Sequence, residues 1–248
     1  MYFLQGVGRV LRDMSLFLAF QPVRPDLERL GPLYFFFGML FTWLAGIARH
    51  WDNPRLERWQ HLGLDSVAYA FILAVVLWGL LWPLKPVNWR FSAVLIFVMM
   101  TAPPALLYAL PPLLLSKDTI LHYGVTWLVH DEYMPVINKW LLLVVATWRV
   151  ALLVLFLRAS AQLNTMAILT ATLLLLALIA VTLGFLNLDN ATFDHKGGGP
   201  RSIDDPAYAI VALIAFVSIL LLPFLSLAHA RLCFAKWRRP RSSPESRP

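Results

Sequence analysis

Six long apolar blocks limit what this chain can fold into. They lie at residues 33–48, 65–84, 91–115, 139–158, 163–187 and 206–230. A bilayer core about 30 Å thick needs about 20 apolar residues per helix. Inside it, only helices and closed barrels satisfy their own backbone polar groups. Barrel strands alternate apolar and polar residues, and these blocks do not. The sequence therefore predicts an all-α, polytopic transmembrane helical bundle with six spans.

Charged residues flank the blocks and set an expected orientation. With the N-terminus inside, the cytoplasmic segments carry 13 of the 21 basic residues and 4 of the 14 acidic ones. Lysine and arginine concentrate on the cytoplasmic side of membrane proteins, so both termini are expected in the cytoplasm. The same distribution explains the pI of about 9.9 without a nucleic-acid partner. A single cysteine, Cys233, excludes an internal disulfide framework and a cysteine-based metal site.

The segment before the first span has its own pattern. Apolar residues recur at three- and four-residue steps at Phe3, Val7, Val10, Met14 and Phe17, which predicts an amphipathic helix. It is expected to lie on the cytoplasmic leaflet or beneath the spans. Prolines 22 and 25 then precede a short charged turn at 26–29. The predicted organisation is a cytoplasmic segment at 1–32, a six-span domain at 33–235, and a disordered basic tail at 236–248.

Arg149 is the most unusual residue within a span. An arginine at the bilayer centre costs at least about 2.5 kcal/mol and normally faces protein, water or a partner. No aspartate or glutamate lies inside the other predicted spans; Asp65 sits at an end. One interpretation is structural, with Arg149 tying helices together or snorkelling to the interface. The other is an anion-binding site formed with Thr147, Trp148 and Tyr108.

The third block contains two proline pairs, Pro103–Pro104 and Pro111–Pro112. Each proline removes a donor and frees a carbonyl four residues earlier, so the helix is expected to kink or break. The freed carbonyls belong to Met99, Met100, Leu107 and Tyr108. They are expected acceptors for Arg149. A purely structural kink is one interpretation, and a substrate cavity on a broken helix is the other.

Histidines and carboxylates gather on the predicted outer side. His50 and Asp52 form a His-x-Asp, and His61 and Asp65 are four residues apart. The second spacing places two side chains on one face of a continuous helix. Imidazole and carboxylate suit zinc or a similar divalent metal. Loops also collect polar residues for solubility alone, and no specific metal motif is present.

Four short stretches carry a resemblance. They are Gly46–Pro54, Gln60–Ser66, Ala102–Pro104 and Thr147–Val150. They resemble a group of uncharacterised bacterial multi-pass inner-membrane proteins over most of the chain. The resemblance implies a bacterial inner membrane and no particular activity. A weaker likeness is to Yip1-domain proteins, which also place a cytoplasmic N-terminal segment before clustered spans.

These features predict a non-enzymatic inner-membrane protein without a cofactor. It would act as an accessory subunit or bind an anionic, lipid-like ligand. Its expected partners are the lipid bilayer and either another membrane protein or a second copy. One alternative is a metal-dependent hydrolase that uses His50, Asp52, His61 and Asp65. The other is a small-solute transporter, restricted to anions because proton- or sodium-coupled carriers usually need a carboxylate within a span.

Overall fold

The computed structural model describes residues 2–23, 25–50, 58–84, 86, 89–110, 134–159, 161–185 and 206–238. Within these ranges the chain is helical and contains no strand, which confirms the all-α prediction. Six helical segments are long and apolar enough to cross a membrane, and they match the six predicted blocks in order: Leu27–Arg49, Leu64–Leu84, Phe91–Ala109, Trp140–Ala159, Thr165–Gly184 and Ala212–Arg238. The protein is a multi-pass membrane protein.

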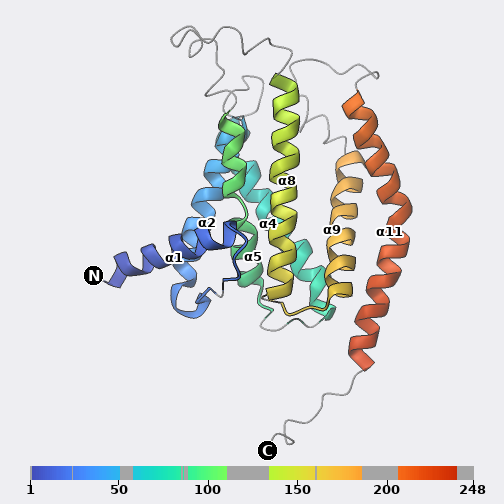
Figure 1. Ribbon diagram of the computed structural model, residues 1–248, viewed down its shortest axis with the longest axis horizontal. Helices are drawn as coiled ribbons and strands as arrows, with labels where there is room; N and C mark the ends of the chain where they lie inside the picture. The colour runs from blue at the N-terminus through green and yellow to red at the C-terminus, as the bar shows by residue number, and fades with distance from the viewer. Residues whose placement is uncertain are drawn as a thin grey trace, which may run out of the picture.

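The spans run side by side and alternate in direction (Figure 1). One end of the bundle, here called the terminal face, holds the start of α2 (Leu27–His50), the start of α5 (Phe91–Met100) and the end of α11 (Pro206–Arg238). The opposite end, the loop face, holds the end of α2 and the start of α8 (Met134–Ala159). The remaining helices are α3 (Arg58–His61), α4 (Leu64–Leu81) and α9 (Thr165–Phe185).

Helix α5 is the centre of the bundle. All seven residues from Val94 to Met100 are buried. Phe97 stacks on Phe156 of α8 with ring centroids 3.8 Å apart, and it also receives the edge of Phe17 from α1 (Tyr2–Leu18). The helix ends at Met100, and a 3-10 helix, η2 (Pro103–Ala109), continues the span. The break predicted at Pro103–Pro104 is therefore confirmed, whereas Pro111 and Pro112 lie outside the described residues.

Small residues on α2 allow two close approaches. A Cβ on Gly38 would lie 2.9 Å from Met99 Cβ of α5. A Cβ on Gly46 would lie 2.7 Å from Gly63, which joins α3 to α4. Gly63 has φ +68°, a left-handed conformation that glycine adopts without strain. The Trp43 indole N–H donates to the Leu62 carbonyl at 2.7 Å, so this turn is held against α2.

Two boundaries differ from the sequence-based expectation. The predicted charged turn at 26–29 is instead the start of α2, because the Asp26 carboxylate accepts the Arg29 backbone N–H at 3.2 Å and caps the helix. Helix α11 continues to Arg238, beyond the expected end at 230, so Lys236 belongs to a helix and not to the tail. A basic last turn favours a helix C-terminus, where the carbonyl dipoles are negative. Residues 239–248 lie outside the described part.

The amphipathic helix α1 is present where the sequence placed it, and it packs against the side of the bundle in the half nearer the terminal face (Figure 1). Its buried residues are Val10, Met14 and Phe17. The hydroxyl of buried Tyr34 on α2 donates to the Asp13 carboxylate. The helix is thus part of the folded domain.

Candidate functional site

Arg149 lies away from either end of its helix. It is ten residues before the end of α8 at Ala159, which is about 15 Å along the helix. Its side chain is half-buried, and the guanidinium carbon lies 6.0 Å from the centroid of the Tyr69 ring on α4. A guanidinium over a tyrosine face at this distance is a cation–π contact. Within the described part of the chain, Arg149 forms no ion pair.

A second arginine belongs to the same neighbourhood. The charges of Arg49 on α2 and Arg149 on α8 both act on the Tyr108 hydroxyl of η2, as does the Tyr69 hydroxyl. Tyr108 is buried. Four elements therefore contribute to one electrostatic neighbourhood, in which the contact with a printed geometry is that of Arg149 with the Tyr69 ring. We call Arg49, Tyr69, Tyr108 and Arg149 the arginine–tyrosine cluster.

Of the four predicted ligand-binding residues, Arg149 and Tyr108 belong to this cluster. Trp148 and Thr147 do not. Trp148 instead turns toward α1, where its indole N–H donates to the Leu18 carbonyl at 3.1 Å and its ring stacks on Phe20. Thr147 is exposed on the outside of α8. Consecutive helical residues point about 100° apart, so neighbours of Arg149 in sequence cannot share its direction.

Two of the carbonyls that the prolines were expected to free, those of Met99 and Leu107, have backbone partners close by in the chain. The Met99 carbonyl accepts the backbone N–H of Ala102 at 3.0 Å. The Leu107 carbonyl accepts that of Leu110. The 3-10 geometry of η2 satisfies these groups locally, because its hydrogen bonds span three residues instead of four. Each of these carbonyls keeps a second lone pair, so a hydrogen bond from Arg149 stays a prediction.

Arg49 and Tyr69 were missed by the sequence reasoning. Arg49 was counted as a loop-side charge, and its residue type is ordinary at a span end. Tyr69 lies five residues after the start of α4 at Leu64, among apolar residues that gave it no distinction. One feature of the sequence could have drawn attention to Tyr69. It follows Asp65 by four residues, so the two lie on one face of α4.

The structure describes the side chains of two of the four predicted metal residues, His61 and Asp65. His61 is the last residue of α3, and Asp65 is the second residue of α4. The left-handed Gly63 separates the two helices, so the prediction that this pair shares one helical face is wrong. The His50 side chain and Asp52 lie outside the described residues. Among those that are described, no three histidine, cysteine or acidic side chains cluster as metal ligands would.

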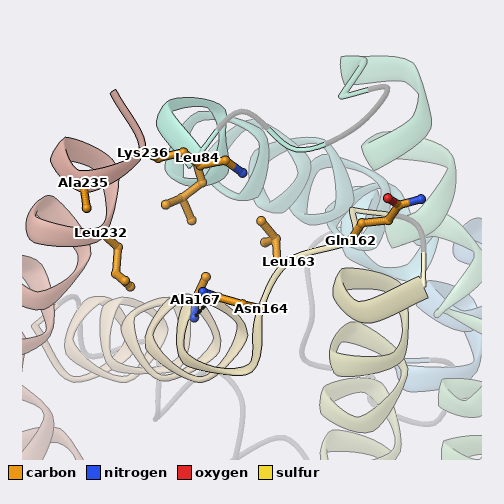
Figure 2. A pocket seen from close by; sticks show the side chains of 8 residues that line it. All are labelled: Leu84, Gln162, Leu163, Asn164, Ala167, Leu232, Ala235 and Lys236. Atoms are coloured by element: carbon orange, nitrogen blue, oxygen red, sulfur yellow. Dashed lines mark hydrogen bonds between the residues drawn. The ribbon is translucent and has the colours of Figure 1, made fainter. Parts of the chain in front are cut away.

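A separate cavity of about 280 Å³ opens at the terminal face. Figure 2 shows it between the end of α11, the start of α9 and the short helix η1 (Trp82–Leu84). Its walls are mainly apolar, with Leu84, Leu163 and Leu232 among them. Lys236 runs past Leu84, whereas the amide of Gln162 points away from the other lining residues. The Asn164 carbonyl oxygen accepts the Ala167 backbone N–H at 2.9 Å and so caps α9. This cavity therefore offers little directed polar chemistry.

Comparisons with known proteins place no constraint on the activity. No protein-family model, no curated protein and no solved structure matches this chain. The resemblance to bacterial multi-pass inner-membrane proteins, and the weaker one to Yip1-domain proteins, stay predictions.

Proposed function

We propose that this protein is a non-enzymatic membrane protein that binds an anionic, lipid-like ligand at the arginine–tyrosine cluster. The observation that carries the proposal is the position of Arg149 in the middle of a membrane-spanning segment, with its guanidinium carbon 6.0 Å from the centroid of the Tyr69 ring. Among the described residues, the contact of the Arg149 guanidinium is with an aromatic ring and not with a carboxylate. A bound anion would neutralise this charge within the span.

The chemistry of the side chains favours a phosphate or a carboxylate as the anion. Guanidinium groups bind such oxyanions through two parallel N–H donors, and these charge-assisted bonds are about twice as strong as neutral ones. The Tyr69 contact alone is worth about 0.5–2 kcal/mol. That is less than the cost of at least about 2.5 kcal/mol for an arginine at the bilayer centre. A bound anionic ligand would supply the rest of the free energy needed to hold Arg149 within the span.

The position of Arg149 favours a ligand with an apolar part. The α4 face that carries Tyr69 is exposed at Ile72 and Val76, three and seven residues further along, and exposed apolar surface on a membrane-spanning helix contacts lipid chains. A lipid-like molecule can place its acyl chains along α4 and its charged group beside Arg149. The cellular setting that we propose is a bacterial inner membrane with both termini in the cytoplasm. The basic residues of the terminal face support that orientation. As an accessory subunit, the protein would associate with another membrane protein, or with a second copy of itself, while the ligand is bound.

The test uses purified full-length protein in a neutral detergent. Dioctanoyl phosphatidic acid, dioctanoyl phosphatidylcholine and inorganic phosphate are titrated separately, and the rise in melting temperature is recorded. We expect phosphatidic acid to raise the melting temperature of the native protein, and phosphatidylcholine to have little effect. A rise in melting temperature with inorganic phosphate would indicate a site for a free anion. A rise with phosphatidic acid alone would indicate a site for a lipid.

Arg149→Gln should weaken phosphatidic acid binding at least tenfold, because one charge-assisted pair contributes about 1.5–3 kcal/mol. Arg149→Lys should weaken it less, since the charge remains without the bidentate geometry. Arg158→Gln is the matched control, because Arg158 is exposed at the other end of the same helix. Unchanged binding in Arg149→Gln contradicts the proposal. If that variant does not fold, Arg149 is structural, and Tyr108→Phe then tests the ligand site alone.

A further inference from the structure

Helix α1 presents three different faces along its length. The first is buried against the bundle and carries Val10, Met14 and Phe17. The second is exposed and apolar, with Leu4 at 75% and Leu11 at 38% exposure. The third carries exposed Arg9 and Arg12. At 100° per residue, Leu4 and Leu11 project on nearly the same line, Arg9 projects roughly opposite to them, and Arg12 projects about a quarter turn from them.

Specific contacts fix the rotation of α1 about its axis. The Tyr34 hydroxyl holds the Asp13 carboxylate, and the Trp148 indole N–H holds the Leu18 carbonyl. The Phe17 ring meets the Phe97 ring edge-on with centroids 5.7 Å apart. A Cβ on Gly6 would already lie 3.0 Å from the Leu33 side chain. Since these contacts involve α2, α5 and α8, the exposed faces have set directions relative to the spans.

A hollow of about 440 Å³ lies along the arginine-bearing side, bordered by Gly8, Arg9, Arg12, Asp13 and Leu16. Gly8 has no neighbouring atom within 4 Å of where a Cβ would be, so this side is open. Asp13 is the one carboxylate among the bordering residues, and its oxygen accepts the Tyr34 hydroxyl. The hollow therefore has two cationic groups at its edge and a carboxylate already engaged with α2.

We propose that Arg9 and Arg12 bind the phosphate of an anionic phospholipid in the leaflet on the terminal face, with α1 acting as a fixed interfacial helix. Leu4 and Leu11 then contact acyl chains while the arginines reach the headgroups, which is the arrangement of helices that lie in a membrane interface. The charge of the two arginines and the separate apolar edge at Leu4 and Leu11 together fit an anionic lipid surface. This site is distinct from the arginine–tyrosine cluster and does not depend on it.

Native mass spectrometry of the full-length protein tests the inference. Protein in neutral detergent is incubated with phosphatidylglycerol, phosphatidylcholine or inorganic phosphate, and the bound molecules are counted. Each basic residue near an anionic surface contributes about a fivefold gain in affinity. Arg9→Gln should therefore weaken phosphatidylglycerol binding about fivefold, and the Arg9→Gln/Arg12→Gln double variant about 25-fold. Phosphatidylcholine binding should not change.

The matched control is Arg90→Gln/Arg158→Gln. It removes two exposed arginines from the terminal face and leaves α1 intact. We expect this control to weaken phosphatidylglycerol binding less than twofold. Equal losses in the two double variants would overturn the proposal, because they would show only a general effect of charge. Retained phosphatidylglycerol in the α1 variant, or binding of inorganic phosphate in place of the lipid, would also overturn it. If the double variant does not fold, the two single variants carry the test, and Arg149 remains intact in all of them.

Discussion

The two halves of this bundle are held together differently. In the segment Phe91–Ala109, which α5 and η2 form, 67% of the residues in the apolar window are buried. In Ala212–Arg238, which belongs to α11, the share is 11%. Helices α2, α4, α5 and η2 pack around one another, whereas α11 packs mainly along α9 (Figure 1). The first group is the packed half, and the α9–α11 pair is the outer hairpin.

The two regions also differ in how closely their helix backbones approach each other. The packed half brings backbones together at Gly38, Gly46 and Gly63, and small residues of this kind drive helix association in membranes. The outer hairpin shows one comparable approach, at Gly184 beside Ala215. A hydrogen bond between the His229 ring and the Leu80 carbonyl at 2.9 Å joins α11 to α4. Three residues of the arginine–tyrosine cluster lie on the packed half, and the fourth is on the adjoining α8.

Gly63→Ala should give the largest effect. The alanine Cβ would lie 2.6 Å from the Trp43 carbonyl oxygen, and φ +68° is strained for alanine. We expect a loss of about 2–4 kcal/mol in the free energy of unfolding, because backbone strain and overlap add. Thermal unfolding in detergent measures it. Gly79→Ala on α4 is the control, since nothing lies within 4 Å of its Cβ position. Similar melting of the two variants would mean that this turn does not hold α2 to α4.

A pair of substitutions compares the two halves directly. Gly38→Ala places a Cβ 2.9 Å from Met99, and Gly184→Ala places one 3.0 Å from Ala215. We expect a loss of about 1–3 kcal/mol for Gly38→Ala, because the surrounding helices cannot move apart. For Gly184→Ala the loss should be under about 0.5 kcal/mol, since α11 faces lipid and can shift. Equal losses in the same unfolding assay would remove the distinction between the halves.

Tyr34→Phe tests the attachment of α1 to the packed half. The change removes the hydroxyl that donates to Asp13 and leaves the ring in place. The expected loss is about 1.5–3 kcal/mol if the carboxylate is charged, since hydrogen bonds to charged groups are the stronger class. Limited proteolysis should then cut within residues 2–23 before any other described segment. Unchanged proteolysis would show that the apolar contacts of α1 suffice.

His229→Leu should have a smaller effect on stability than the substitutions Gly63→Ala, Gly38→Ala and Tyr34→Phe. It removes the ring bond to the Leu80 carbonyl, which is worth about 0.5–1.5 kcal/mol. The main expected change is in the position of α11 relative to α4. Spin labels on exposed residues of α4 and α11, such as Val75 and Phe224, should show a broader distance distribution in the variant. An unchanged distribution would place the hairpin's attachment elsewhere.

Hydropathy was enough to predict the architecture, because each span must satisfy its own backbone and face lipid. The six spans and the break at Pro103–Pro104 are confirmed. The shared face of His61 and Asp65 was wrong, because spacing assumes a continuous helix and Gly63 ends it. A glycine between two polar residues was the available warning.

The arginine–tyrosine cluster was only partly predictable. The cost of a charge in lipid identifies Arg149 from its position alone. The approach of Arg49 and Tyr69 depends on how α2, α4 and η2 pack, which requires knowledge of the glycine contacts. The contact of Trp148 with α1 could not be predicted, because its hydrogen-bond partner, Leu18, lies 130 residues earlier in the chain. Contacts at such separations leave no local pattern.

The most direct test of the account is to identify what the protein carries from its own membrane. The native protein and Arg149→Gln are extracted in polymer-bounded bilayer discs and washed into neutral detergent, and bound molecules are measured by mass spectrometry. The account predicts a near-stoichiometric phosphate- or carboxylate-bearing lipid on the native protein and its loss from Arg149→Gln, with both proteins folded. The same molecules at the same occupancy on both proteins would contradict it.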